Sequence, residues 1–276
     1  MDITTPAAPT EEVEQFPWYS LNPRALKSSR IFHAILIGLL LACFSIVPVW
    51  RAGWYYPVYS AKAFFPMRDA HGRWRKAWQW CYGKEIRIYE GPGVQKRSGE
   101  TIRQGVQAMV DEVKLDFKVK LLPMPPAILD AFTASTVKKM ENGRPRTYVS
   151  FAALEKRLIE MREGDPHADI LIVDAPMTEA WWAHGMATFG SGLGVMEDEN
   201  VDFHLGKHET GHLLGYLNHD DMPLFVFGYP WEDFPWKRDT LMMLFSPSTE
   251  LSPRSRDALN AFWRGLEHRT GRKFFR

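Results

Sequence analysis

Hydrophobic and polar residues from Lys84 onward alternate between the period of a strand and that of a helix. Glu85–Tyr89 and Phe117–Leu121 alternate residue by residue, which predicts two strands. Between them apolar residues recur at helical spacing, namely Ile102, Val106, Met109, Val110 and Val113. The pattern predicts a strand–helix–strand unit in which the two strands pair in parallel.

Two further strands are predicted later in the chain. Ala168–Asp174 is nearly continuous apolar sequence, as in a central strand that is buried on both faces. Gly185–Glu197 combines glycines with apolar residues, which predicts an irregular edge strand. Strands that alternate with helices in this way indicate an α/β domain.

An insertion and a last helix complete the predicted elements. Residues 127–165 form the insertion, with a turn at Gly143–Pro145 and a helix over Phe151–Met161. Ser252-Pro253 is an N-cap followed by proline at the first helical position. The helix that begins there has one apolar stripe, formed by Leu259, Phe262, Trp263 and Leu266.

An apolar run, Ile31–Trp50, contains no formally charged residue. At about 1.5 Å per helical residue it reaches about 30 Å, the thickness of the hydrocarbon core of a bilayer. Aromatic residues close the run, as at a membrane–water interface: Trp50, Trp54, Tyr55 and Tyr56. The run predicts one transmembrane helix and a single-pass membrane protein.

Basic residues flank this run unequally, with Arg24, Lys27 and Arg30 before it and Arg51 and Lys62 after it. The excess of basic residues before the run favours a cytoplasmic N-terminus. This orientation places the domain that follows outside the cytoplasm. Two alternatives to an anchor are a cleaved signal peptide and a lipoprotein signal around Leu40–Cys43.

The chain divides into four segments in this interpretation. Residues 1–30 are a proline-rich, acidic tail that we expect to be disordered, and residues 31–50 are the anchor. Residues 51–83 are an aromatic and basic juxtamembrane segment, which lies against lipid headgroups or packs under the domain. Residues 84–276 form the folded domain.

Composition narrows the set of partners. The 34 lysines and arginines against 33 aspartates and glutamates give a formal net charge of +1, so nothing indicates nucleic acid as a partner. The chain has two cysteines, Cys43 and Cys81, which exclude a disulfide framework and a cysteine-rich zinc site.

The segment His208–His212 carries the candidate chemistry. On a helix that starts at about Phe203, His208 and His212 lie about 40° apart around the axis, so both rings reach one metal ion. Glu209 projects toward a water on that ion. This H-E-x-x-H arrangement is typical of a zinc hydrolase, in which zinc lowers the pKa of its water and the carboxylate takes the proton. Histidines that merely striped the helix would be costly to bury unpaired.

The run His208–Asp220 resembles the metzincin clan of zinc endopeptidases, and within it the matrixin family. Other segments resemble matrixins in the same order: Ala168–Asp174 the central strand, Trp182–Phe189 the edge strand above the cleft, Thr240–Met243 the Met-turn, and Leu251-Ser252-Pro253 the start of the C-terminal helix. The resemblance covers about residues 84–270. It implies a twisted mixed sheet, an active-site helix, a C-terminal helix and a Met-turn with Met242 beneath the metal (Met243 is the second choice).

The third metal ligand departs from the pattern of the resembled family. By that spacing it falls on Asn218, whose amide oxygen is a poor zinc ligand. Gly215 ends the helix, and a turn longer by one residue brings His219 into place, which is the preferred prediction. A carboxylate of Asp220 or Asp221 is an alternative, and a later acid such as Glu232 is another.

The resemblance implies a zinc endopeptidase that acts on a protein or peptide, and the apolar run adds a membrane anchor. Zn2+ held by His208, His212 and His219 polarises a peptide carbonyl, with Glu209 as general base. The edge strand aligns an extended substrate by strand addition. The alternative is a catalytically silent, membrane-tethered binding or scaffold protein with the same fold.

Overall fold

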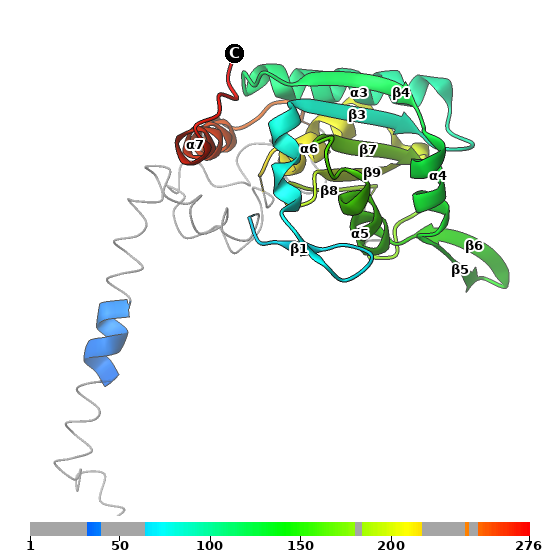
Figure 1. Cartoon of the computed structure of the whole chain (residues 1–276), viewed down its shortest axis with the longest axis horizontal. Helices are drawn as coiled ribbons and strands as arrows, with labels where there is room; N and C mark the ends of the chain where they lie inside the picture. Colours follow the sequence, from blue (N-terminus) through cyan, green and yellow to red (C-terminus); the bar gives the residue numbers. More distant parts are fainter. Residues whose placement is uncertain (1–31, 40–63, 180–183, 217–240, 243–247) are drawn as a thin grey trace, which may run out of the picture. The chain divides into compact units, whose positions relative to one another are not determined.

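The structure is a computed structural model that describes residues 32–39, 64–179, 184–216, 241–242 and 248–276. The chain falls into two compact units, residues 1–47 and residues 48–276. Figure 1 traces the described elements of both units.

In the first unit, residues 32–39 form a single helix, blue in Figure 1. Among the residues that the structure describes, no helix is both long and apolar enough to span a membrane. The prediction of one transmembrane helix over residues 31–50 is therefore wrong, and so is the single-pass membrane localisation based on it. Residues 31 and 40–50 lie outside the described part.

A five-stranded mixed sheet forms the centre of the second unit. The strands, in the order β4–β3–β7–β9–β8, are Lys118–Pro123, Glu85–Glu90, Ala168–Val173, Leu193–Glu197 and Gly185–Thr188. The first four are parallel, whereas β8 pairs antiparallel with β9. The predicted parallel pairing of the strands now seen as β3 and β4 is confirmed, with Glu85 opposite Lys118.

β7 is the central strand of the sheet and is buried along its whole length, as predicted. Its residues alternate between two cores, because successive strand residues face opposite sides. Ile170 and Ile172 belong to one core, whereas Leu171 and Val173 belong to the other. A strand that is covered on both faces is mostly apolar, and this explains the nearly continuous run. Its one charged residue, Asp169, is buried in an ion pair with Arg162.

Helices cover both faces of the sheet (Figure 1). α3 (Lys96–Glu112), α6 (Phe203–Leu213) and α7 (Pro253–Thr270) share the core of one face. α4 (Pro126–Thr133) and α5 (Phe151–Met161) share the core of the other. The apolar stripes predicted for α3 and α7 are buried, and α5 has the predicted bounds.

Glycines let α6 approach α3 closely. A β-carbon at Gly105 would lie 2.4 Å from the Phe203 carbonyl oxygen, and one at Gly206 would lie 3.0 Å from that of Ile102. The two helices therefore pack backbone to backbone. This contact fixes the position of α6 relative to the sheet, because α3 itself packs on β3 and β4.

The glycine-rich segment Gly185–Glu197 is two strands, not the single irregular strand that was predicted. In the turn between β8 and β9, the Gly192 amide donates to the Thr188 carbonyl oxygen at 3.0 Å. Gly192 has φ +65°, and a β-carbon there would lie 2.5 Å from the Trp80 ring. Glycine is thus required both by the turn and by the packing of Trp80. A 3-10 helix, η3 (Asp198–Asn200), follows β9.

The insertion contains a β-hairpin that the sequence pattern did not predict. β5 (Thr136–Glu141) and β6 (Arg144–Val149) pair antiparallel and project from the sheet domain (Figure 1). Asn142 and Gly143 connect them, and both have positive φ. Two positive φ values are typical of the type I′ turn, whose twist suits a hairpin.

Residues 64–83 precede the sheet and pack on one of its cores. β1 (Met67–Arg68) and β2 (Trp74–Arg75) form a short antiparallel pair, and η2 (Ala77–Gly83) is a 3-10 helix. Trp80 on η2 is buried, and its indole nitrogen donates to the Phe189 carbonyl oxygen at 2.7 Å. This segment is therefore continuous with the folded domain.

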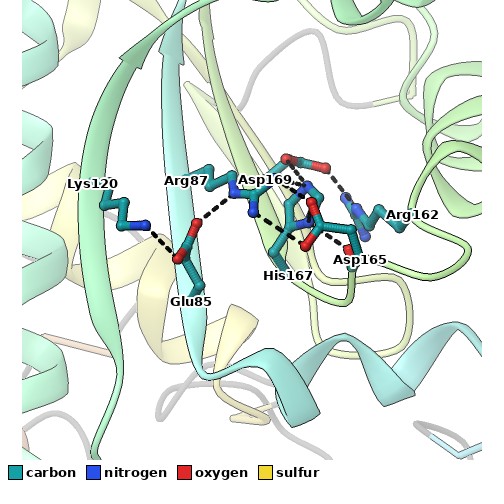
Figure 2. A network of polar contacts seen from close by, with 7 residues as sticks. All are labelled: Glu85, Arg87, Lys120, Arg162, Asp165, His167 and Asp169. Atoms are coloured by element: carbon teal, nitrogen blue, oxygen red, sulfur yellow. Dashed lines mark hydrogen bonds and ion pairs between the residues drawn. The ribbon is translucent and has the colours of Figure 1, made fainter.

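A buried ion pair stands at the start of β7 (Figure 2). Arg162 Nε lies 2.5 Å from Asp169 Oδ2, and His167 Nε2 lies 3.1 Å from Asp169 Oδ1. Burial raises the pKa of Asp169, but the positive charge of Arg162 and the contact with His167 outweigh it and hold the pKa below its usual value. The carboxylate thus stays ionised inside the protein.

A second chain of ion pairs crosses the neighbouring strands (Figure 2). Lys120 on β4 contacts Glu85 at 2.6 Å, and Glu85 contacts Arg87 at 2.5 Å. Arg87 on β3 then contacts Asp165, before β7, at 2.8 Å. Together the two groups of charges form a clamp, which ties the N-terminal halves of three parallel strands, β4, β3 and β7.

Candidate metal and catalytic site

α6 carries the H-E-x-x-H segment and is capped at both ends. Asp202 caps its first turn by accepting a hydrogen bond from the Leu205 amide at 2.6 Å. At the other end Gly215, with φ +106°, turns the chain, and the Tyr216 amide donates to the Gly211 carbonyl oxygen at 2.9 Å. The helix therefore starts and ends where the sequence predicts.

His208 and His212 lie one turn apart on α6, and a backbone carbonyl orients each ring. His208 Nδ1 lies 2.5 Å from the Leu241 carbonyl oxygen, and His212 Nδ1 lies 2.6 Å from that of Tyr216. A carbonyl oxygen only accepts, so each Nδ1 carries a hydrogen, and a ring that is neutral then has its lone pair at Nε2. The two Nε2 atoms lie 3.2 Å apart.

This separation suits a shared metal ion. At this distance a hydrogen on one ring or a metal ion can lie between the two Nε2 atoms. With zinc–nitrogen bonds of about 2.0–2.1 Å, two ligands of a tetrahedral zinc ion lie about 3.3 Å apart. Imidazole nitrogen is also a common zinc ligand. The residues in place therefore fit Zn2+ in both spacing and chemistry.

Glu209 is buried next to the histidines, with 5% of its surface exposed. Its Oε2 atom has no hydrogen-bond partner within the part of the chain that the structure describes. Burial raises the pKa of Glu209 to about 8, and a neighbouring cation would lower it again. A buried carboxylate oxygen without a partner is costly. A metal-bound water would remove that cost, so Glu209 also fits a metal site.

β8 forms the wall beside Glu209. A β-carbon at Gly185 would lie 2.6 Å from Glu209 Cγ and 2.7 Å from its Oε1 atom. Glycine at the first residue of β8 therefore leaves the room that the carboxylate occupies. The edge strand of the sheet and the predicted base are in direct contact at this point.

Met242 packs against α6 at the level of the histidines. It is fully buried, and a β-carbon at Gly211 would lie 2.5 Å from its sulfur. Gly211 directly precedes His212, so the thioether of Met242 contacts the turn that carries both imidazoles. The neighbouring residue, Leu241, supplies the carbonyl that orients His208. One short segment thus provides a floor and a hydrogen-bond acceptor.

The predicted third ligand, His219, lies outside the described residues. The same holds for the alternative ligands and for the second choice of Met-turn residue, namely Asn218, Asp220, Asp221, Glu232 and Met243. The structure therefore brings together His208, Glu209, His212 and Met242, and the third ligand stays a prediction.

Sequence reasoning missed four residues that shape this site. Leu241 and Tyr216 act through their backbone carbonyls. Every residue has such a carbonyl, so the residue type does not indicate this role. Gly185 and Gly211 act by close approach. Gly211 did carry a signal, because glycine inside a helix is unfavourable and often marks a packing contact.

A second group of potential metal ligands lies near β1, within the described residues: Asp69, His71 and Glu160. Both carboxylates are already engaged by guanidinium groups. Asp69 Oδ2 accepts from Arg73 Nε at 2.8 Å and from Arg75 Nε at 3.1 Å, and Glu160 Oε1 accepts from Arg73 at 2.9 Å. A divalent cation would sit beside two positive charges there. We therefore interpret the group as an ion-pair cluster that joins the β1–β2 turn to α5.

No protein-family model and no curated protein sequence matches this chain. Among solved structures it is similar to a zinc-dependent peptidase from Methanocorpusculum labreanum (strain Z), with 15% identity and a TM-score of 0.40 over 63% of this chain and 100% of that one. It is also similar to a chaperone–substrate complex, with 16% identity and a TM-score of 0.33 over 66% of this chain and 34% of that one. At these scores neither likeness establishes an activity.

Proposed function

We propose that the protein is a zinc-dependent peptidase. The observation that carries the proposal is the pair of imidazoles, His208 and His212, whose Nε2 atoms meet at 3.2 Å while both Nδ1 atoms are held by carbonyls. His219 is the third ligand in this proposal. Proteins or peptides are the substrate class.

Glu209 is the general base of the proposed reaction. Zinc, when bound, supplies a water of lowered pKa and polarises the carbonyl of the scissile peptide. Glu209 accepts the proton of that water at Oε2 and later delivers it to the nitrogen of the leaving amine. Burial supports this role, because a low dielectric strengthens the interactions of the carboxylate with a positive centre.

β8 aligns the substrate in this proposal. It is the last strand of the sheet in the described part of the chain, with β9 on its inner side. Gly185, its first residue, stands against Glu209. An extended peptide that added to the outer side of β8 would therefore pass the base with its backbone aligned.

The test of the base is Glu209→Gln in the full chain. We expect the variant to retain zinc, measured by elemental analysis after dialysis, and to lose about 10²- to 10⁴-fold in hydrolysis of a denatured protein mixture. Glu100→Gln, on the exposed face of α3, is the matched control and should leave the rate unchanged. Normal hydrolysis by Glu209→Gln would contradict the assignment.

The third ligand needs a separate test. We expect His219→Ala to lose zinc on dialysis, whereas Asn218→Ala and Asp220→Ala should retain it. Retention by His219→Ala, with loss in one of the other two, would move the ligand to that residue. A zinc-loaded wild-type protein that cleaved no substrate would instead support the non-catalytic binding protein.

A further inference from the structure

Basic side chains concentrate on the β5–β6 hairpin. Its strands carry one acid, Glu141, against four cations: Lys138, Lys139, Arg144 and Arg146. All of these residues are exposed. Arg146 contacts Glu141 at 3.1 Å. Within the described ranges, no carboxylate lies at ion-pair distance from the other three cations.

The strand register divides these cations between two faces. Residues opposite each other in an antiparallel pair share a face, and the next residue along the strand takes the other face. Lys139 is opposite Arg146, and Glu141 is opposite Arg144. Lys139, Arg144 and Arg146 therefore share one face, which we call the basic face. Lys138 lies on the opposite face.

Tyr148 orders the basic face. Lys139 Nζ lies 5.1 Å from the centre of its ring, and Arg146 Cζ lies 5.8 Å from it. The Tyr148 hydroxyl donates to Glu141 at 3.0 Å. These contacts and the tight Asn142-Gly143 turn preorganise the cations, so a ligand would not have to order a loose loop.

The basic face turns toward the catalytic end of the sheet. Arg146 Nη2 lies 3.8 Å from Glu197 Oε1, and Glu197 Oε2 lies 3.6 Å from His184 Nδ1. His184 directly precedes Gly185, which abuts Glu209. The hairpin is thus linked to the candidate base through two intervening side chains and the start of β8.

We propose that the basic face binds an acidic segment of the peptide substrate, to one side of the scissile bond. The inference rests on the proposed peptidase function and names its substrate class. A peptide that leaves β8 at Gly185 would run past His184 and along the hairpin. Aspartate and glutamate side chains there would neutralise Lys139 and Arg144, whereas neutral or basic segments would leave both cations uncompensated.

Binding is measured on full-length, zinc-loaded Glu209→Gln protein, so that cleavage does not consume the probe. The probes are fluorescent peptides that are identical except for glutamates in one and glutamines in the other. The acidic block is placed at either end in separate versions, because β8 admits a strand in either direction. Fluorescence anisotropy should show tighter binding of the glutamate peptide for one placement, and raising the salt to about 0.5 M should remove the difference.

The hairpin supplies its own matched control. Arg144→Gln removes an exposed cation from the basic face and should weaken binding of the glutamate peptide about two- to fivefold. Lys138→Gln removes the same charge from the opposite face of the same hairpin and should leave binding unchanged. The glutamine peptide should not respond to either variant.

Three results would overturn the proposal. One is equal binding of the two peptides, and another is an equal loss for Arg144→Gln and Lys138→Gln, which would indicate a diffuse charge effect. The third is tighter binding of a single-stranded oligonucleotide than of the glutamate peptide, with the same dependence on Arg144. If the acidic peptide binds as expected but wild-type protein cleaves no substrate, the peptidase function fails while the acidic-segment site stands.

Discussion

At the scale of single residues, the site depends on backbone groups as much as on side chains. The carbonyls of Leu241 and Tyr216 set the tautomers of His208 and His212. Any residue offers such a carbonyl, so substitution at 216 or 241 preserves the acceptor as long as the backbone stays in place. The spacing of the histidines could be predicted from the sequence. The orientation of their rings could not, because it depends on backbone carbonyls, which every residue has.

Gly185→Ala should reduce activity without removing the metal. The added β-carbon would overlap Glu209 Cγ, which lies 2.6 Å from its ideal position, and would displace the carboxylate. Displacing the carboxylate of Glu209 by about 1 Å should lower the rate of peptide hydrolysis about 10- to 100-fold. The zinc content should stay the same. Gly265→Ala in α7 is the control, because its β-carbon would meet Arg269 Nη2 at an ordinary 3.8 Å. Unchanged hydrolysis by Gly185→Ala would show that Glu209 adjusts freely.

Asp169→Asn should destabilise the fold strongly. The change leaves the guanidinium of Arg162 buried without its counter-charge, which costs about 3 kcal/mol in the free energy of unfolding. Glu100→Gln breaks an exposed pair with Arg103 and should change that free energy by less than about 0.5 kcal/mol. Urea unfolding at neutral pH compares the two. Similar values for both variants would mean that the buried pair contributes no more than a surface pair.

At the scale of elements, periodicity predicted those strands and helices whose burial is regular. β3 and α5 have apolar residues that repeat with the period of the structure that buries them. β7 was predicted from its nearly continuous apolar run, which fits burial on both faces. The β5–β6 hairpin has no such repeat, because most of its strand residues are exposed. A turn was predicted at Gly143–Pro145, and the observed turn is one residue earlier, at Asn142-Gly143, a residue pair typical of a two-residue hairpin turn.

The first turn of α5 should make the stability of the protein depend on pH. Glu179 accepts hydrogen bonds from the Ser150 hydroxyl at 2.7 Å and from the Phe151 amide at 3.0 Å. Burial raises its pKa, but these bonds and that from Thr178 outweigh it and lower the pKa from 4.5 to about 2. The stabilisation is therefore complete above pH 4.5, the pKa of the unfolded chain, and is lost as the pH falls toward 2.

Glu179→Gln tests this assignment. Because the side chain is exposed, we expect the variant to lose only about 1 kcal/mol in the free energy of unfolding at pH 7. The difference from wild type should shrink as the pH is lowered from about 4.5 toward 3. A difference that stayed constant over this range would assign the effect to packing rather than to charge.

At the scale of the whole molecule, the order of elements was predictable and the N-terminal apolar run was not. Among the described residues, no helix is both long and apolar enough to span a bilayer, although the sequence run 31–50 has the length to do so. Residues 64–83 show a similar limit, because their aromatic side chains suit a membrane interface and a protein core equally well.

Removal of zinc should lower the thermal stability of the whole domain. A metal that binds only the folded state stabilises it by mass action, so a chelator should lower Tm by roughly 5–15 °C. Added zinc should restore Tm in Glu209→Gln, which keeps the ligands, but not in His212→Ala. Calorimetry of the full chain measures these shifts. A Tm that changed neither with chelator nor with added zinc would contradict a metal site on α6.

The charged clamp of Figure 2 lies near the start of β7, whereas the candidate base, Glu209 on α6, contacts Gly185 of β8 near the opposite end of the sheet. Asp169 is opposite Leu193 on β9, whereas Gly185 is opposite Met196, three residues further along. At about 3.3 Å per residue, this is a separation of about 10 Å. Substitutions at such a distance without shared partners combine additively. Thermostability can therefore be engineered at the clamp without the loss of turnover that usually accompanies stabilisation near a reactive centre.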